Sequence, residues 1–223
     1  MPQLEAVLFD MDGLLVDTEP IWTVAEVELA RQLGGEFTPE LKAAIVGTPL
    51  EVAVPTILRW YGGPTDDATV TRTMRWLLVR MVELFEQRPP IQPGVEELLM
   101  ALAAAGIPTA LVSSSYRVLV DAVLSHGVGP FDLTLAGDEV RQGKPHPEPY
   151  LTAASRLGVD PRRCVVLEDS PAGVASAEAA GCAVVAVPSV EGIEFATTSG
   201  RLVLSSLADL RLSDLAALLT AAA

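Results

Sequence analysis

Two aspartates follow the first apolar run of the chain at a spacing that suits acid–base and nucleophilic chemistry. The run Ala6-Val-Leu-Phe leads directly into Asp10-Met-Asp12-Gly13, which places two carboxylates at the carboxyl end of an expected strand. Ligands of open α/β sheets bind at that edge. Asp and Gly also favour turns for purely structural reasons, so this turn alone leaves both explanations open.

Three further positions with chemical potential follow along the chain. Ser113 comes after a short apolar run, Lys144 lies in Gly-Lys-Pro-His-Pro-Glu-Pro-Tyr, and Glu168 and Asp169 follow another run. Each has a simpler structural explanation. The serine could cap a helix, the lysine could be solvated, and the acidic pair could favour the N-terminal dipole of the next helix. For His146 we expect only a local hydrogen bond.

The candidate residues share one property that these separate explanations do not account for. Asp10, Asp12, Ser113, Glu168 and Asp169 all fall at carboxyl ends of predicted parallel strands, which meet at one edge of a sheet. Four carboxylates at one edge repel one another unless a cation neutralises them. Carboxylate oxygens are ligands that suit a hard divalent ion, so the sequence predicts a Mg²⁺ site.

The elements that position these residues follow from the apolar pattern. Short apolar runs at 6–9, 109–112, 133–136, 165–167 and 183–187 predict buried parallel strands. Helical stretches at 95–105, 149–157 and 171–180 each end at a glycine, where a helix C-terminus favours positive φ. Alternating strands and helices predict a doubly wound α/β core.

A helical insertion interrupts this core. We expect the core to comprise residues 1–17 and 90–223, and the insertion with its Pro-rich linker to comprise 18–89. Thr38-Pro39 and Thr65-Asp66 are expected N-terminal caps within it. All three tryptophans fall in the insertion, and their helical spacing favours core packing for Trp60 and Trp76.

Composition limits the partners of the chain. The 223 residues carry a net charge of −14 with only 15 Lys and Arg, so a basic surface for nucleic acid or anionic membranes is missing. No segment approaches the roughly 18 continuous apolar residues of a membrane span. We expect a cytoplasmic monomer without nucleic-acid or membrane partners. Cys164 and Cys182 are expected to be buried reduced thiols, although a disulfide between neighbouring strands stays geometrically open.

The run Asp10-Met-Asp-Gly-Leu-Leu-Val-Asp-Thr-Glu-Pro20 resembles the first motif of the haloacid dehalogenase superfamily. It is most similar to the subfamily that contains β-phosphoglucomutase and the hexitol and 2-deoxyhexose phosphatases. Ser113, Lys144 and the segment starting at Glu168 match the later motifs in the family's order, so the resemblance spans nearly the whole chain. It implies a Rossmann-like core with an inserted all-helical cap, and a Mg²⁺-dependent phosphatase that acts on a small phosphorylated metabolite.

The resemblance also implies a role for each residue. Asp10 would attack phosphorus and form an aspartyl-phosphate. Asp12 would protonate the leaving alcohol and then activate water. Lys144 and Ser113 would hold the transferring oxygens, with Ser114 beside them, and such charge stabilisation usually dominates phosphoryl transfer.

The metal ligands implied by the resemblance overlap with the catalytic residues. They are the carboxylates of Asp10 and Asp169 and the backbone carbonyl of Asp12, with Glu168 binding directly or through water. The bond between Lys144 and its following proline can be cis in relatives, and we expect it to be cis here, although this isomer is uncommon in proteins.

Two positions favour hydrolysis over mutase activity. The phosphoglucomutases carry a His shortly after the first motif and an Arg in the insertion, whereas Trp22 and Leu50 take those places here. Trp22 is an expected substrate contact, and a sugar or polyol phosphate is the favoured substrate. A phosphosugar mutase and a noncatalytic phosphate-binding regulatory protein remain alternatives, and the sequence does not distinguish a hexose or hexitol phosphate from phosphoglycolate or a nucleotide.

Overall fold

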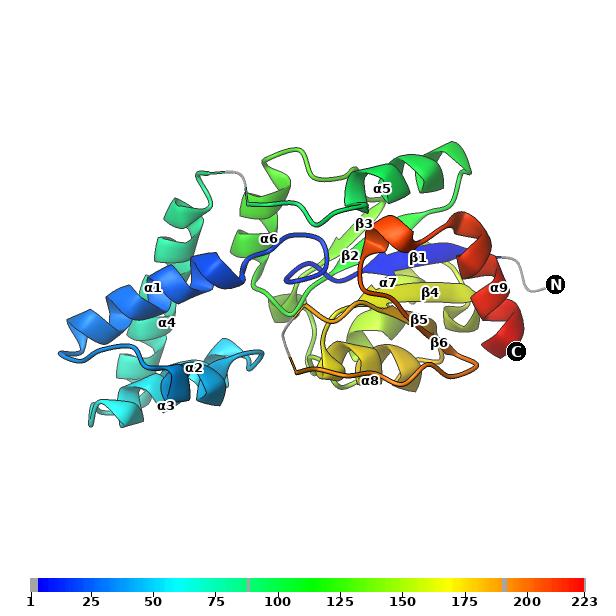
Figure 1. Cartoon of the computed structure of the whole chain (residues 1–223). Coiled ribbons are helices and arrows are strands. Elements are labelled where there is room, and N and C mark those ends of the chain that lie inside the picture. Colours follow the sequence, from blue (N-terminus) through cyan, green and yellow to red (C-terminus); the bar gives the residue numbers. More distant parts are fainter. Residues whose placement is uncertain (1–3, 88, 190–191, 223) are drawn as a thin grey trace. The chain divides into compact units, whose positions relative to one another are not determined.

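The chain forms two compact units, which we describe separately. A computed structural model describes residues 4–87, 89–189 and 192–222 (Figure 1). Unit 1 comprises Met1–Asp17 and Pro89–Ala223, and unit 2 comprises Thr18–Arg88. Over the described residues, none of the helices combines the length and the apolar composition that crossing a membrane requires.

Unit 1 is built on a parallel sheet whose described strands follow the order β3-β2-β1-β4-β5-β6. The strands are β1 (Ala6–Phe9), β2 (Thr109–Val112), β3 (Leu133–Leu135), β4 (Cys164–Glu168), β5 (Ala183–Ala186) and β6 (Arg201–Val203). The four central strands β1, β2, β4 and β5 are fully buried, which explains why each reads as a continuous apolar run. The predicted doubly wound core is confirmed. The sequence did not predict β6, because this three-residue edge strand is half-exposed.

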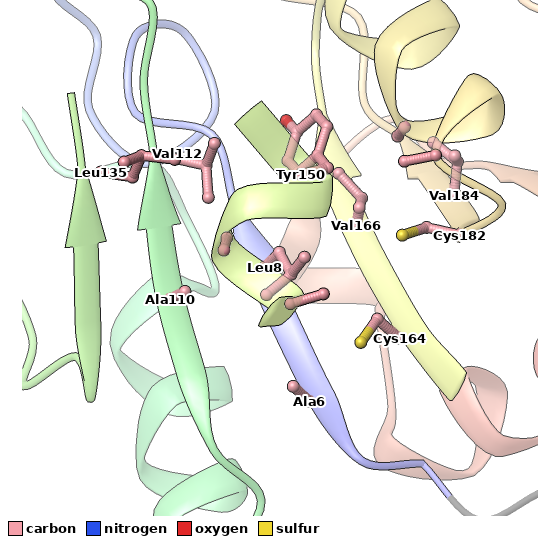
Figure 2. Packing of buried hydrophobic residues seen from close by; sticks show 14 of the residues in the cluster. Ala6, Leu8, Ala110, Val112, Leu135, Tyr150, Cys164, Val166, Cys182 and Val184 are labelled. Carbon is pink, nitrogen blue, oxygen red and sulfur yellow. The ribbon is translucent and has the colours of Figure 1, made fainter. Parts of the chain in front are cut away.

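Helices cover both faces of this sheet (Figure 1). Helices α7 and α8 pack on one face, and Figure 2 shows the apolar cluster beneath them, with Leu8, Val112, Val166 and Val184 directed toward α7 and α8. Helices α5 and α9 cover the opposite face. The helices of unit 1 are α5 (Val95–Ala104), α6 (Arg117–Leu124), α7 (Glu148–Leu157), α8 (Pro171–Ala179) and α9 (Leu212–Ala222).

Both cysteines belong to this buried cluster (Figure 2). Cys164 begins β4, and Cys182 precedes β5, the next strand of the sheet. Both are free thiols, as the sequence predicted. Burial raises the pKa of Cys164 to about 12 and also raises the pKa of Cys182, so neither is a reactive thiolate at neutral pH.

Unit 2 consists of helices α1 (Glu19–Gln32), α2 (Pro39–Ile45), α3 (Leu50–Trp60) and α4 (Asp67–Leu84) over its described residues. The two predicted N-caps are confirmed. Thr38 accepts a hydrogen bond from the Leu41 amide, and Asp66 accepts one from the Thr69 amide. All regular elements in the described residues of unit 2 are helices, so the predicted all-helical insertion is confirmed.

The prediction that Trp60 packs in the core is wrong. Its side chain is 47% exposed at the last residue of α3. Tyr61, one residue later, is half-buried. Its ring occupies the space next to Gly35, where a Cβ would lie only 2.2 Å away, and its hydroxyl donates to the Glu36 carbonyl at 2.7 Å. Trp76 is half-buried within α4, in part as predicted.

Candidate active site

The carboxyl ends of β1 and β4 lie side by side where the strand order of the sheet reverses. Phe9 is in register with Leu167, and the Asp10 amide donates to the Leu167 carbonyl at 3.0 Å. Asp10 and Glu168 therefore leave the sheet next to each other. Such a switch point is where open α/β sheets bind their ligands.

Lys144 joins the ends of three neighbouring strands. Its ammonium donates to Asp10 Oδ1 at 2.5 Å, to the Val112 carbonyl at 2.9 Å and to Glu168 Oε1 at 2.6 Å. All three of its donors are thus used. The side chain is only 4% exposed, so the alternative of a solvated lysine is wrong. The bond between Lys144 and Pro145 is cis, as expected.

Burial and like charges shift the acid–base equilibria of this cluster. Burial raises the pKa of Asp10 well above its usual range, and Lys144 opposes that rise while the neighbouring carboxylates add to it. The pKa of Asp169 rises to about 7, through burial and then through Glu168. Burial alone would lower the pKa of Lys144, but Asp10 and Glu168 raise it, so the ammonium stays charged. Without a metal ion, Asp10 and Asp169 therefore hold their protons more strongly than ordinary aspartates.

The donor set at these strand ends fits a hard divalent cation. One carboxylate oxygen each from Asp10, Glu168 and Asp169 lies within 4.8 Å of the others, and all three residues are buried. A single ammonium does not balance three buried carboxylates. Oxygen donors with surplus negative charge are the environment that Mg²⁺ prefers in proteins.

Two serine hydroxyls hold the carboxylate of Asp12. Ser113 donates to Asp12 Oδ2 at 3.1 Å and Ser115 donates to the same oxygen at 2.8 Å. Ser113 also accepts from the Ser115 amide at 2.9 Å, and Tyr116 rather than Ser113 is the N-cap of α6. Ser113 is therefore not the cap of that helix. Ser115 was not predicted as a site residue, although the run of three serines from Ser113 was a visible signal.

Glycine 13 lets the loop after β1 approach Asp169. Its φ is +87°, and a Cβ there would lie 2.1 Å from Asp169 Oδ2 and 2.6 Å from Ser189 Oγ. Ser189 donates to Asp169 Oδ2. Ser189 was not predicted from the sequence, because it lies 20 residues after Asp169, beyond the end of β5, and belongs to no recognised motif.

The carboxylate of Glu168 is held by the two residues that precede α8. Its Oε2 accepts from Ser170 Oγ at 3.1 Å and from the Asp169 amide at 3.2 Å. A Cβ on Gly173 would lie within 2.0 Å of the carboxylate, so this position requires glycine. Its Oε1 accepts from the Tyr150 hydroxyl at 2.5 Å. Tyr150 ends the motif that contains Lys144 but was not predicted as a site residue.

Ser114 and Trp22 are the two remaining predicted substrate contacts. Ser114 is exposed, and Trp22 is half-buried in α1 of unit 2. His146 accepts the Glu148 amide at 3.2 Å, which is the local hydrogen bond expected for it. The Arg117 guanidinium pairs with Glu139 and also donates to Thr134 Oγ1.

The sequence belongs to a known enzyme family. Residues 4–181 match the haloacid dehalogenase-like hydrolases, and relatives at least 30% identical cover nearly the whole chain. This chain therefore belongs to the haloacid dehalogenase superfamily, as its motifs predicted.

Similar proteins are known from sequence and from structure. Hexitol phosphatase B of Escherichia coli (strain K12) is 34% identical over 221 residues, covering 96% of this chain and 93% of that protein. The crystal structure of CbbY from Rhodobacter sphaeroides in complex with phosphate has a TM-score of 0.84 and 30% identity, covering 96% of this chain and 100% of that one. The mutant D10N of CbbY in complex with xylulose-(1,5)-bisphosphate has a TM-score of 0.83 and 29% identity, covering 96% and 99%. The phosphatase name of the first relative agrees with the predicted class of phosphoric monoester hydrolase.

Proposed function

We propose that this chain is a Mg²⁺-dependent phosphatase that hydrolyses a small phosphate monoester, a sugar or polyol phosphate, through an aspartyl-phosphate on Asp10. The observation that carries the proposal is the position of the Asp10 carboxylate. It lies at the switch point of the sheet, 2.5 Å from the Lys144 ammonium and beside the carboxylates of Glu168 and Asp169. A noncatalytic phosphate-binding protein has no need of these carboxylates, because they repel an anion.

The first step that we propose is attack of an Asp10 oxygen on phosphorus. The bond from phosphorus to the substrate oxygen breaks, and Asp12 gives its proton to the departing alcohol. Ser113 and Ser115 support this role, because both hydroxyls hold one oxygen of Asp12 and so fix the direction of its carboxyl group. Lys144 adds positive charge where phosphoryl oxygens approach Asp10.

The second step returns the enzyme to its starting state. Asp12, now a carboxylate, accepts a proton from water while the water oxygen attacks phosphorus. The bond between phosphorus and Asp10 breaks and inorganic phosphate leaves. Mg²⁺ would be held by Asp10 and Asp169 with the Asp12 carbonyl and Glu168, and it would supply positive charge that neutralises the transferring group. Substrate binding should therefore depend on the metal ion.

A single phosphate group on the substrate is the second part of the proposal. Trp22 and Leu50 carry no charge, and the Arg117 guanidinium is already paired with Glu139. Hexitol phosphatase B, by its name, acts on substrates with an uncharged polyol remainder, whereas the CbbY mutant binds a sugar bisphosphate. We favour the first type of substrate, with Trp22 and Ser114 as contacts.

The roles of the two units are part of the same proposal. Residues 1–17 and 90–223 form the catalytic core, and residues 18–89 form a cap that sets the choice of substrate. A cytoplasmic location, a monomeric state and the lack of nucleic-acid and membrane partners stay predictions from the sequence.

Phosphate release from a panel of monoesters tests the proposal. The panel contains hexitol and hexose phosphates, phosphoglycolate, a nucleoside monophosphate and a sugar bisphosphate, each with Mg²⁺ and with chelator. We expect hydrolysis of a polyol or sugar monophosphate that stops with chelator. A hexose 1-phosphate that is converted to the 6-phosphate faster than phosphate is released would show a mutase. Lack of phosphate release from every ester would contradict the proposed function.

A further inference from the structure

Tyr150 links the core of unit 1 to the candidate active site. The whole residue is buried between α7 and the sheet, and Figure 2 shows its ring among the apolar side chains of the cluster. Its hydroxyl nevertheless donates to Glu168 Oε1 at 2.5 Å. The Lys144 ammonium lies 5.0 Å from the centre of its ring. One side chain thus contacts both the carboxylate and the ammonium that neighbour Asp10.

The contacts of Glu168 show why this hydroxyl matters. The oxygen Oε2 is fixed by Ser170 Oγ and the Asp169 amide, which lie just before α8. The oxygen Oε1 is held by two donors, the Lys144 ammonium at 2.6 Å and the Tyr150 hydroxyl at 2.5 Å. Without the hydroxyl, the lysine would be the remaining donor in this pair. Because a carboxylate attracts an ammonium more strongly when no other donor shares its charge, the lysine would then move toward Glu168 and away from Asp10.

We propose that Tyr150 is a positioning residue for the reaction at Asp10. Its hydroxyl fixes the direction of the Glu168 carboxylate, and its ring faces the Lys144 ammonium, a favourable arrangement for a cation. Together they hold Lys144 at hydrogen-bond distance from Asp10 Oδ1. Tyr150 does not touch the substrate. This inference rests on the proposed function, because the reaction it serves is the one proposed for Asp10.

A packing role alone predicts a different outcome from a positioning role. A tyrosine that only fills the core would affect the free energy of unfolding and leave the kinetic constants of the folded enzyme unchanged. A positioning residue changes kcat, because it acts on the groups that stabilise the transition state, and it leaves KM nearly constant.

The substitution Tyr150→Phe isolates the hydroxyl. It keeps the ring, the packing against the sheet and the contact with Lys144, and it removes only the donor to Glu168. The matched control is Tyr61→Phe in unit 2, where the tyrosine hydroxyl also makes one hydrogen bond, to the Glu36 carbonyl. With p-nitrophenyl phosphate and saturating Mg²⁺, we expect Tyr150→Phe to lower kcat about tenfold and to leave KM within about twofold. Tyr61→Phe should leave both constants unchanged.

A crystal structure of metal-free Tyr150→Phe supplies a readout that does not depend on activity. We expect the Lys144 ammonium to lie beyond about 3.5 Å from Asp10 Oδ1 in this variant. If Tyr150→Phe fails to fold, Glu168→Gln takes its place. The amide removes the charge that competes with Asp10 for the lysine, so the ammonium should stay within about 3.5 Å of Asp10 Oδ1, and a longer distance would contradict the balance between the two carboxylates on which the positioning role depends.

The outcomes separate this inference from the proposed function. If the wild-type protein releases phosphate but kcat of Tyr150→Phe stays within twofold of it, the positioning role is wrong and the proposed function stands. The positioning role is also wrong if the Lys144 ammonium stays at hydrogen-bond distance from Asp10 Oδ1 in the crystal structure of Tyr150→Phe. If the wild-type protein hydrolyses no ester, the proposed function fails, and the crystal structure still decides whether Tyr150 positions Lys144.

Discussion

Each unit contains one lysine placed between two carboxylates, and the two clusters differ mainly in burial. In unit 1, Lys144 pairs with Asp10 at 2.5 Å and with Glu168 at 2.6 Å, and its side chain is 4% exposed. In unit 2, Lys42 pairs with Glu26 at 2.7 Å and also with Glu19, and its side chain is 22% exposed. The residue types and the distances are nearly the same.

The difference shows what turns an ion pair into a candidate reaction centre. Lys42 and Glu26 connect two helices, α1 and α2, and the lysine is partly exposed, which is a common setting of a structural ion pair. Lys144 connects strand ends where Asp169 adds a further buried carboxylate. Burial raises the pKa of Asp10 and of Asp169, and the neighbouring carboxylates add to the rise. Such shifts are common at functional sites.

The largest expected effect separates the nucleophile from its counterpart in unit 2. Asp10→Asn should lower turnover by about a thousandfold or more, because an amide does not act as the nucleophile. The matched substitution Glu26→Gln should keep kcat within about twofold, since Glu26 belongs to a structural pair. Phosphate release by both variants measures this difference. Equal rates for wild-type protein and Asp10→Asn would end the assignment of Asp10.

Replacing each lysine by methionine compares what the two lysines contribute to stability and to turnover. Lys144→Met should lower the free energy of unfolding by about 3 kcal/mol, because it leaves buried carboxylates unpaired, and it should lower kcat about a hundredfold. Lys42→Met should cost less, about 1 kcal/mol, because Glu19 is exposed and solvent screens its charge, although Glu26 stays buried. Urea unfolding and steady-state kinetics of both variants provide the measurements. Similar losses for the two lysines would show that burial does not distinguish the clusters.

The raised pKa of Asp169 predicts an unusual pH dependence. In the folded protein this pKa is about 7, against 3.8 for an unperturbed Asp, so the native state keeps a proton that the unfolded chain has released between these values. The contribution of Asp169 to the free energy of unfolding is therefore fully present below about pH 4, and it is lost as the pH rises toward 7.

Urea unfolding of chelator-treated protein between pH 4.5 and 8 measures this effect. We expect a contribution on the order of 2 kcal/mol that Asp169→Asn abolishes, since an amide does not titrate. Saturating Mg²⁺ should flatten the dependence by replacing the proton. A slope that is the same in wild-type protein and in Asp169→Asn would rule out this role of Asp169.

The smallest expected effect concerns the exposed tryptophan of unit 2. Trp60→Gln should change the free energy of unfolding by less than about 0.5 kcal/mol, because an exposed side chain loses little packing. Leu58→Ala, two residues earlier in α3, removes a buried side chain and should cost about 2–5 kcal/mol. Thermal unfolding of the two variants compares them directly. A large loss for Trp60→Gln would restore the core assignment that its helical spacing suggested.

Sequence patterns predicted the parts of the fold in which one physical cause dominates. The central strands are buried on both faces, so the apolar runs at 6–9 and 109–112 match β1 and β2 residue for residue. The edge strand β6 was not predicted, because its half-exposed residues do not form a continuous apolar run. Trp60 was misplaced because helical spacing does not reveal where α3 ends.

The residues of the candidate site were also predicted only in part. Asp10, Glu168 and Asp169 converge because they follow parallel strands, and a strand end is visible in the sequence. The contacts of Tyr150 and Ser189 depend on how a helix and a loop pack against those strands. That packing joins residues that are far apart in the chain, so no local sequence pattern predicts it.

Chemical trapping of the intermediate tests the central claim most directly. The Mg²⁺-loaded enzyme is quenched in acid during turnover of its best substrate, reduced with borohydride and digested for mass spectrometry. An acyl-phosphate is reduced to an alcohol, whereas a free carboxylate is not. We expect conversion of Asp10 to homoserine only when substrate is present. Reduction at Asp12, Asp169 or another carboxylate, or unmodified Asp10 in enzyme that is releasing phosphate, would contradict it.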